Sequence, residues 1–400
     1  MPRPLQSILS CFRPTPPAEE RASTSTGQPV DSAPHPPRRA PVTLQGLANF
    51  DAQRIRQRQV EIQALVPDTR KALSDGECQL GGYVHARQVD GRPVEGTALE
   101  RLKRGNETVM ETRQALAHGR GNVTADINDS NGLSTIRTEA GRNARPKIPR
   151  HYGQKLRVTA STLAAQAGNC GEHAYVATFL HAGKLQKGER VHCVGSTKKD
   201  HGWAELRGKT SDRAHDVVMD PWAKGPAIFA IDGALSKDKH AVETEHHYDR
   251  RSGAKAHAKM QKLQRKEHSQ IQADVHEEMA KLGPDFRYPS DESSVWSATP
   301  VISKEFAERV VDKMIREPDP AKLAPEHEDQ VQQAAERVDI GERRMAPLRQ
   351  EVHATQIART LGASGVKEVS KAAARIANVA VDLQRYPLAS HPAQTAPNDV

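Results

Sequence analysis

The fold is decided by one stretch, which reads Gly168-Asn169-Cys170-Gly171-Glu172-His173-Ala174. Its first two residues are turn formers. The following run, 172–180, contains no glycine or proline, which predicts a helix that ends at Gly183. Cys170 is therefore expected at a helix N-terminus, where unpaired N–H groups and the positive end of the helix dipole favour a thiolate and lower the cysteine pKa from ~8.5. The same N–H groups are candidate donors to an oxyanion.

Two segments further along the chain each end or begin with a polar residue. The alternation from His201 to Leu206 predicts a strand that carries His201 and Trp203 on one face, as the wall of a shielded cleft requires. The run 216–220 is rich in valine and is stopped by Pro221, which places Asp220 at a strand end. From there the Asp220 carboxylate could accept the second ring N–H of His201 and fix its tautomer.

These motifs carry a family resemblance. The order Gly-Asn-Cys-Gly-Glu-His-Ala, His-x-Trp and Asp-Pro-Trp resembles the core of the transglutaminase-like superfamily, relatives of the papain-like thiol proteases, over about residues 150–235. The resemblance implies Cys170 as nucleophile, His201 as base and Asp220 as orienter. Papain-type enzymes also carry an oxyanion-hole glutamine before the cysteine. The nearest candidate, Gln166, stands closer to the cysteine than in papain, and it joins Asn169 and Trp203 as candidates for oxyanion or cleft support.

The predicted fold class is α+β. A helix followed by strands at 190–194, 201–207 and 216–220 predicts a transglutaminase/papain-like core with helical flanks. Only 36% of the 400 residues are hydrophobic and 4% aromatic, so a well-buried core occupies part of the chain. The predicted organisation is a disordered Pro/Ser-rich secretion tail (1–45), a helical lead-in region (46–145), the Cys-His-Asp catalytic core (146–250), a helical C-terminal region (251–386) and a disordered tail (387–400).

Several other patterns are given plainer interpretations. Cys193 lies mid-strand and is expected to be a small buried hydrophobe, while His173 is expected to be a surface residue or to support the site from behind Cys170. The glycine pair that begins Gly81-Gly82-Tyr83-Val84 indicates a loop or short hairpin. The basic residues of segment 142–157 are interpreted as a solvated linker rather than a phosphate-binding strip.

No metal and no cofactor are expected. The one candidate cluster, Glu243, Glu245, His246 and His247, lacks regular ligand spacing. The four cysteines are too few and too scattered for a disulfide framework, which favours a reducing compartment.

The N-terminal tail suggests a delivery route. Ten of the 26 prolines lie at positions 2–41, and neither a signal-peptide core nor a run of ~18 apolar residues is present. Such a tail ahead of a thiol-enzyme core resembles bacterial effectors exported by the type III route. The resemblance implies a soluble protein without a transmembrane segment, secreted by a bacterium into the host cytoplasm. Its expected partners are a host protein substrate and a secretion chaperone on the N-terminal region.

Three functions compete at this point. The first is a thiol-dependent acyl-transfer enzyme acting on protein amides, as a glutamine deamidase, a transglutaminase or a cysteine protease. The second is a catalytically inactive effector that binds a host protein. The third is a basic nucleic-acid-binding protein, resting only on the net charge of +8, and no DNA partner is expected. The first is favoured because competent residues fill all three chemical positions.

Overall fold

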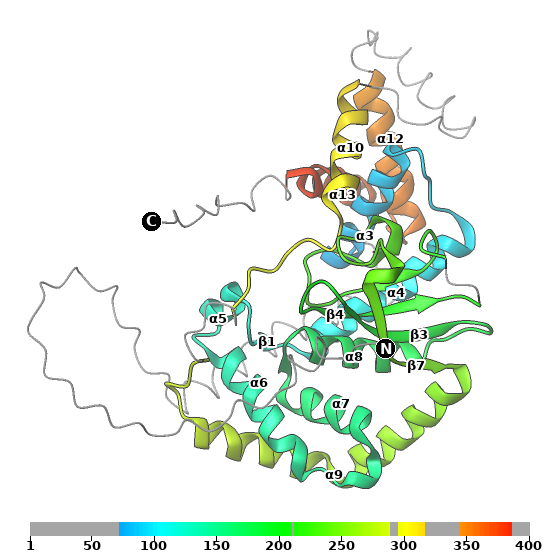
Figure 1. The fold of residues 1–400 in the computed structure, drawn as a ribbon. Helices are drawn as coiled ribbons and strands as arrows, with labels where there is room; N and C mark the ends of the chain where they lie inside the picture. Colours follow the sequence, from blue (N-terminus) through cyan, green and yellow to red (C-terminus); the bar gives the residue numbers. More distant parts are fainter. Residues whose placement is uncertain (1–71, 210–211, 289–294, 317–344, 386–400) are drawn as a thin grey trace, which may run out of the picture.

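The computed structural model describes residues 72–209, 212–288, 295–316 and 345–385. This part of the chain is a mixed fold in which a five-stranded antiparallel sheet lies between two groups of helices (Figure 1). The predicted α+β class is confirmed at this level. The predicted tails at 1–45 and 387–400 lie outside the described residues.

The sheet has the strand order β6-β5-β4-β3-β7, and every neighbouring pair is antiparallel. The three predicted strands are confirmed with shifts of one or two residues at their ends. In β3 and β4, Cys193 lies opposite Ala204 and Val194 lies opposite Trp203. The strands are β3 (Arg190–Ser196), β4 (Gly202–Arg207), β5 (Val217–Met219), β6 (Ile228–Phe229) and β7 (Val242–Asp249).

Helix α8 (Cys170–Ala182) begins and ends where the sequence predicts, with Gly183 as its C-cap. It packs against β3 and β4. The first turn of α8 comes close to β4 at Gly202, where an added Cβ would lie 3.8 Å from Cβ of Ala174 and 3.3 Å from the carbonyl of Val194. The small residue at the start of β4 thus allows the helix N-terminus to approach the strand end that follows His201.

Helices α3 (Asp75–Val89) and α4 (Gly96–Ala115) form one wall of the main hydrophobic core. The prediction of a loop at Gly81-Gly82 is wrong, because both glycines lie inside α3. A Ser74–Glu77 capping box starts this helix, and a Cβ on Gly81 would meet Ile376 at 2.7 Å. Close packing between helices therefore outweighs the ~1 kcal/mol that a helical glycine costs.

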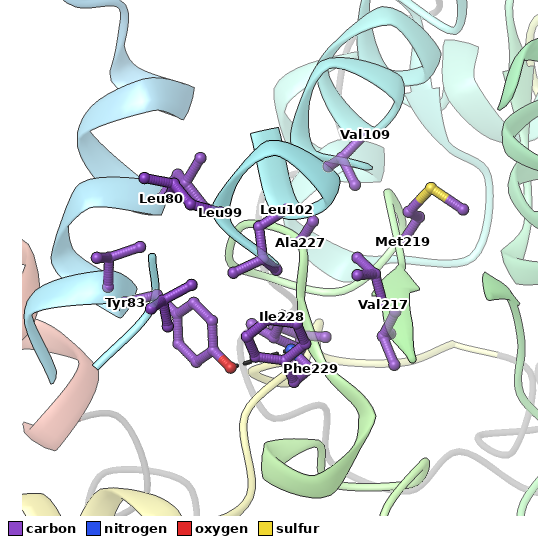
Figure 2. Packing of buried hydrophobic residues seen from close by; sticks show 14 of the residues in the cluster. Leu80, Tyr83, Leu99, Leu102, Val109, Val217, Met219, Ala227, Ile228 and Phe229 are labelled. Atoms are coloured by element: carbon purple, nitrogen blue, oxygen red, sulfur yellow. Dashed lines mark hydrogen bonds between the residues drawn. The ribbon is translucent and has the colours of Figure 1, made fainter. Parts of the chain in front are cut away.

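Figure 2 shows how this wall meets the sheet. Side chains of α3 and α4 point toward those of β5 and β6, and the whole group is buried. The Tyr83 hydroxyl accepts a hydrogen bond from the backbone N–H of Phe229 at 3.0 Å, so the contact includes a polar link. The labelled residues are Leu80, Tyr83, Leu99, Leu102, Val109, Val217, Met219, Ala227, Ile228 and Phe229.

A second hydrophobic cluster joins α8 to α6 (Leu133–Ala144), α7 (Gln154–Ala165) and α9 (Arg250–Leu282). Ile136, Phe179 and Val275 are among its buried members. The long polar helix predicted to stop at Gly283 is confirmed as α9, which lies below α6 and α7 in Figure 1. The solvated-linker interpretation of segment 142–157 is wrong, because this segment contains the end of α6, the buried Arg145 and the first turn of α7.

The remaining elements are shorter or lie toward the C-terminus. Strands β1 (Gly119–Arg120) and β2 (Ala167–Gly168) form a parallel pair that brings the loop after α4 beside the start of α8. None of the described helices is long and apolar enough to cross a membrane. The other elements are α5 (Thr124–Asp129), α10 (Lys304–Arg316), α12 (Met345–Thr360), α13 (Val366–Arg385) and the 3-10 turns η2 (Arg145–Lys147), η3 (Arg150–Tyr152), η4 (Ala230–Asp232) and η5 (Lys239–Ala241).

Candidate active site

Cys170 is the first residue of α8, and Asn169 is the N-cap. The Asn169 backbone N–H donates to a carboxylate oxygen of Glu172 at 3.0 Å, which satisfies one of the donors at the helix start. The Cys170 side chain is buried from bulk solvent but lines a cavity of about 300 Å³. The predicted position of the thiol at a helix N-terminus is confirmed.

Glu172 is fixed by Arg142, near the end of α6, and by Arg145, the first residue of η2, whose side chains are each only 10% exposed. Arg142 donates to both carboxylate oxygens at 3.0 Å, and Arg145 donates to one of them at 3.2 Å. Burial raises the pKa of Glu172, but the two guanidinium groups outweigh it and hold the pKa at about 2. The charged carboxylate therefore ties the helix start to the end of α6.

His201 and Asp220 lie next to each other on neighbouring strands. Nε2 of His201 donates to Oδ2 of Asp220 at 2.6 Å, and the ring also hydrogen-bonds the Cys170 thiol. Because Nε2 is occupied by the carboxylate, Nδ1 is the nitrogen left for the thiol. The structure thus brings together the three residues predicted as nucleophile, base and orienter.

The electrostatics of this group favour a charged imidazole. Burial alone lowers the pKa of His201, but the Asp220 carboxylate and, to a smaller extent, Cys170 outweigh it and raise the pKa to about 10. Burial by itself raises the pKa of Asp220, but the neighbouring His201 outweighs this effect, so the pKa of Asp220 is lowered. The second carboxylate oxygen of Asp220 accepts the backbone N–H groups of Trp222 at 3.1 Å and Ala223 at 3.0 Å.

Two tryptophans enclose the His201 ring. Trp203 stacks at 24° with ring centroids 5.8 Å apart, and Trp222 is tilted at 55° with centroids 5.0 Å apart. Both indoles are buried. They exclude water from the His201–Asp220 bond, which strengthens its electrostatics. Trp203 thus lies against the His201 ring but, unlike Trp222, it does not line the cavity that holds Cys170.

Asn122 is a site residue that the sequence reasoning missed. Its side-chain Oδ1 accepts the indole N–H of Trp222 at 3.1 Å, and it lines the same cavity as Cys170. An indole N–H can only donate, so the atom that it contacts must be the amide oxygen of Asn122. The other atom of the amide group is then Nδ2, which is a hydrogen-bond donor. Asn122 comes beside Cys170 because Gly121 continues the β1–β2 pairing, its N–H donating to the carbonyl of Gly168.

Gln166 does not take the place that the resemblance implies. It ends α7 in the left-handed conformation, with φ of 55°, and its carbonyl accepts the backbone N–H of His118. It is not among the residues that line the cavity. Asn169 is buried at the helix cap, where its backbone rather than its side chain makes the contact with Glu172 described above.

Of the two positions predicted for His173, at the surface or supporting the site from behind Cys170, the surface position is wrong. It is buried one turn into α8, and its Nδ1 lies 2.9 Å from the carbonyl of Asn169. Burial lowers the pKa of His173 to about 4, so the ring is neutral at pH 7. A neutral ring that donates to the Asn169 carbonyl stiffens the turn before Cys170.

The cavity beside Cys170 has an aromatic and aliphatic wall with charged residues at its edge. Trp296 lines it and is 42% exposed, although most tryptophans are largely buried. The backbone N–H of Trp296 donates to the carbonyl of Asn122 at 2.8 Å, which holds the two walls together. Lys199 and Lys304 also line the cavity. Its volume suits one amino-acid side chain and the adjoining backbone.

Comparisons with known proteins add no identity: no family model, no curated protein and no solved structure matches the chain. The function is therefore inferred from the side chains of the site.

Proposed function

We propose that the chain is a thiol-dependent acyl-transfer enzyme that acts on protein amides, similar to transglutaminase-like and papain-like enzymes. The observation that carries the proposal is the bonding of one imidazole to both the Cys170 thiol and the Asp220 carboxylate beside a cavity. A nucleophile, a base and an orienter in mutual contact are the parts that nucleophilic catalysis requires.

In the proposed first step, the Cys170 thiolate attacks the carbonyl carbon of a substrate amide. The electron pair of the C=O bond moves to oxygen, and the resulting oxyanion is stabilised by the amide N–H of Asn122 and the backbone N–H of Cys170. The His201 imidazolium gives its proton to the amide nitrogen as the C–N bond breaks. A thioester on Cys170 and a free amine or ammonia result.

In the second step, water or an amine attacks the thioester. Neutral His201 takes a proton from the attacking group, the C–S bond breaks, and the thiolate and imidazolium are restored. Asp220 holds the ring in one tautomer throughout both steps. A peptide amine as leaving group makes the enzyme a protease, and ammonia makes it a deamidase or, with an amine acceptor, a transglutaminase.

The proposal extends to the setting of the enzyme. The proline-rich N-terminal segment is similar to that of bacterial type III effectors, which supports delivery of the chain by a bacterium into a host cell, where a host protein is the substrate. That segment is also where a secretion chaperone would bind.

The test is product analysis by mass spectrometry. Full-length protein and its Cys170→Ala variant are incubated with eukaryotic cell lysate, and new peptide termini, glutamine-to-glutamate conversion and cross-links are sought. Cys78→Ala is the matched control, because Cys78 is another buried free thiol in α3. We expect one product class from the wild-type and Cys78→Ala proteins and none from Cys170→Ala. Equal products from all three would refute the proposal, and none from any would favour the inactive binding protein.

A further inference from the structure

A second group of chemically active side chains lies in the sheet, at the pairing of β3 with the edge strand β7. The register slips between Cys193 and Val194: Cys193 lies opposite His246, while Val194 lies opposite Thr244. Glu245 therefore has no partner residue on β3 and forms a β-bulge. A bulge re-aims side chains, so consecutive residues of β7 can reach the same partner on β3.

The bulge gathers three metal-ligating groups. The Cys193 thiol, a carboxylate oxygen of Glu245 and a ring nitrogen of His246 all lie within 4.8 Å of one another. The thiol contacts the Glu245 carboxylate at 3.8 Å. Cys193 and His246 are buried, whereas Glu245 is half-buried and gives the group a side open toward solvent.

Tyr175, on helix α8, contacts two of these three side chains. The Tyr175 hydroxyl, on α8, donates a hydrogen bond to Glu245, and its ring centroid lies 4.8 Å from that of His246. Within the described part of the chain, Nδ1 of His246 is buried with no hydrogen-bond partner. A buried imidazole nitrogen without a partner is costly unless something else binds there.

We propose that Cys193, Glu245 and His246 bind one divalent transition-metal ion of the zinc type. Thiolate sulfur, imidazole nitrogen and carboxylate oxygen are the ligands that Zn²⁺ takes in proteins, and three of them leave a fourth position for water. Bond lengths of ~2.0–2.3 Å place tetrahedral ligand atoms roughly 3.3–3.8 Å apart, so side-chain movements of about 1 Å close the site.

Metal binding at this site involves no change of oxidation state. The metal forms a bond to sulfur, and the Cys193 thiol proton leaves to solvent. A neutral imidazole offers a nitrogen lone pair, so His246 can bind the metal through a ring nitrogen. The Tyr175 hydroxyl then orients the ligating carboxylate from outside the coordination sphere. The bound ion would fix the edge strand β7 to β3 and, through Tyr175, to the helix that begins at Cys170.

The experiment uses Co²⁺ as a spectroscopic probe and full-length Cys170→Ala protein, so that the thiol beside His201 cannot bind the ion. We expect an intense near-ultraviolet thiolate-to-cobalt absorption that saturates at one Co²⁺ per chain and is displaced by Zn²⁺. The band should disappear on adding Cys193→Ala and persist on adding Cys78→Ala, the matched buried thiol. Absence of the band, or its persistence without Cys193, would overturn the proposal.

Two further variants keep the test decisive if Cys193→Ala fails to fold. Glu245→Gln and His246→Gln retain side-chain size and should each abolish saturation at one Co²⁺ per chain, with circular dichroism confirming the fold. Tyr175→Phe removes only the outer hydroxyl and should weaken Co²⁺ binding about 10–100-fold. Unchanged Co²⁺ affinity in both glutamine variants would show that the cluster is only a hydrogen-bonded group.

Discussion

Cys170 and Cys193 are two buried thiols with different surroundings, exposed by 2% and 1%. Cys170 begins a helix, hydrogen-bonds an imidazole and lines a cavity, whereas Cys193 lies mid-strand against a carboxylate. Burial, with Glu245 adding to it, raises the pKa of Cys193 well above its usual range. Burial alone therefore does not decide what a cysteine does. The charge that faces the sulfur and the space beside it distinguish the proposed nucleophile from a thiol that stays protonated until a metal displaces its proton.

The largest expected difference is in alkylation. In wild-type protein with a chelator present, iodoacetamide at pH 7 should modify Cys170 on the order of 10³-fold faster than Cys193, because only a thiolate reacts. Peptide mass spectrometry over time gives both rates from one sample. Cys78 is an internal reference, since burial and then Glu77 raise its pKa to about 11. Equal rates at Cys170 and Cys193 would remove the distinction between the two sites.

The next effect concerns the support of the helix that carries Cys170. Glu172→Gln removes the charge that Arg142 and Arg145 share, and taking one partner out of a buried ion-pair group should lower the free energy of unfolding by about 3–5 kcal/mol. Urea denaturation measures this. Glu100→Gln is the control, because its 3.1 Å pair with Lys103 is exposed and should contribute at most ~1 kcal/mol. Similar losses in both variants would contradict a supporting role specific to Glu172.

The next prediction compares the effect of Asn122 on the proposed reaction with its effect on alkylation of Cys170. Asn122→Ala should reduce kcat on an identified substrate about 10²–10³-fold, because one oxyanion donor is lost. Iodoacetamide alkylation of Cys170 forms no oxyanion, so its rate should change little in the same variant. Gln166→Ala, at the position implied by the resemblance, should behave as wild type in both assays. A large loss in Gln166→Ala and none in Asn122→Ala would restore the original assignment.

The last expected effect is on stability as a function of pH. The pKa of His201 is raised from 6.5 to about 10, so its protonated form contributes stability that is fully present below pH 6.5. That contribution declines above pH 6.5 and is lost as the pH rises through about 10. Urea midpoints of wild-type and His201→Gln proteins should therefore differ most at pH 6 and least at pH 10. A difference that does not vary with pH would mean that His201 has the same pKa in the folded and unfolded protein, which would contradict the raised pKa.

The sequence predicts well what local pattern controls. A cap, a helix without breakers and a strand stopped by proline place Cys170 and Asp220 correctly, because each depends on a few neighbouring residues. What it misses depends on contacts between distant segments. Asn122 becomes a site residue only through Trp222, and the glycines near Gly81 become helical through packing on a C-terminal helix.

Two arginines at the end of α6 and the start of η2 illustrate the same limit. Arg142 and Arg145 lie in a basic, proline-interrupted segment whose composition suggests exposure. Their carboxylate partner, Glu172, belongs to α8, and nothing in the composition around the arginines indicates that pairing. The β-bulge that brings Glu245 toward Cys193 is similarly invisible in either strand taken alone.

The central claim is that His201 holds Cys170 as a thiolate, and the pH dependence of Cys170 alkylation tests it most directly. The iodoacetamide rate is measured from pH 5 to pH 9 in wild-type and His201→Ala proteins. We predict that the wild-type rate has already reached a plateau at neutral pH, whereas in His201→Ala it still rises about tenfold per pH unit toward the ordinary thiol pKa of ~8.5. Superimposable profiles in the two proteins would contradict the account.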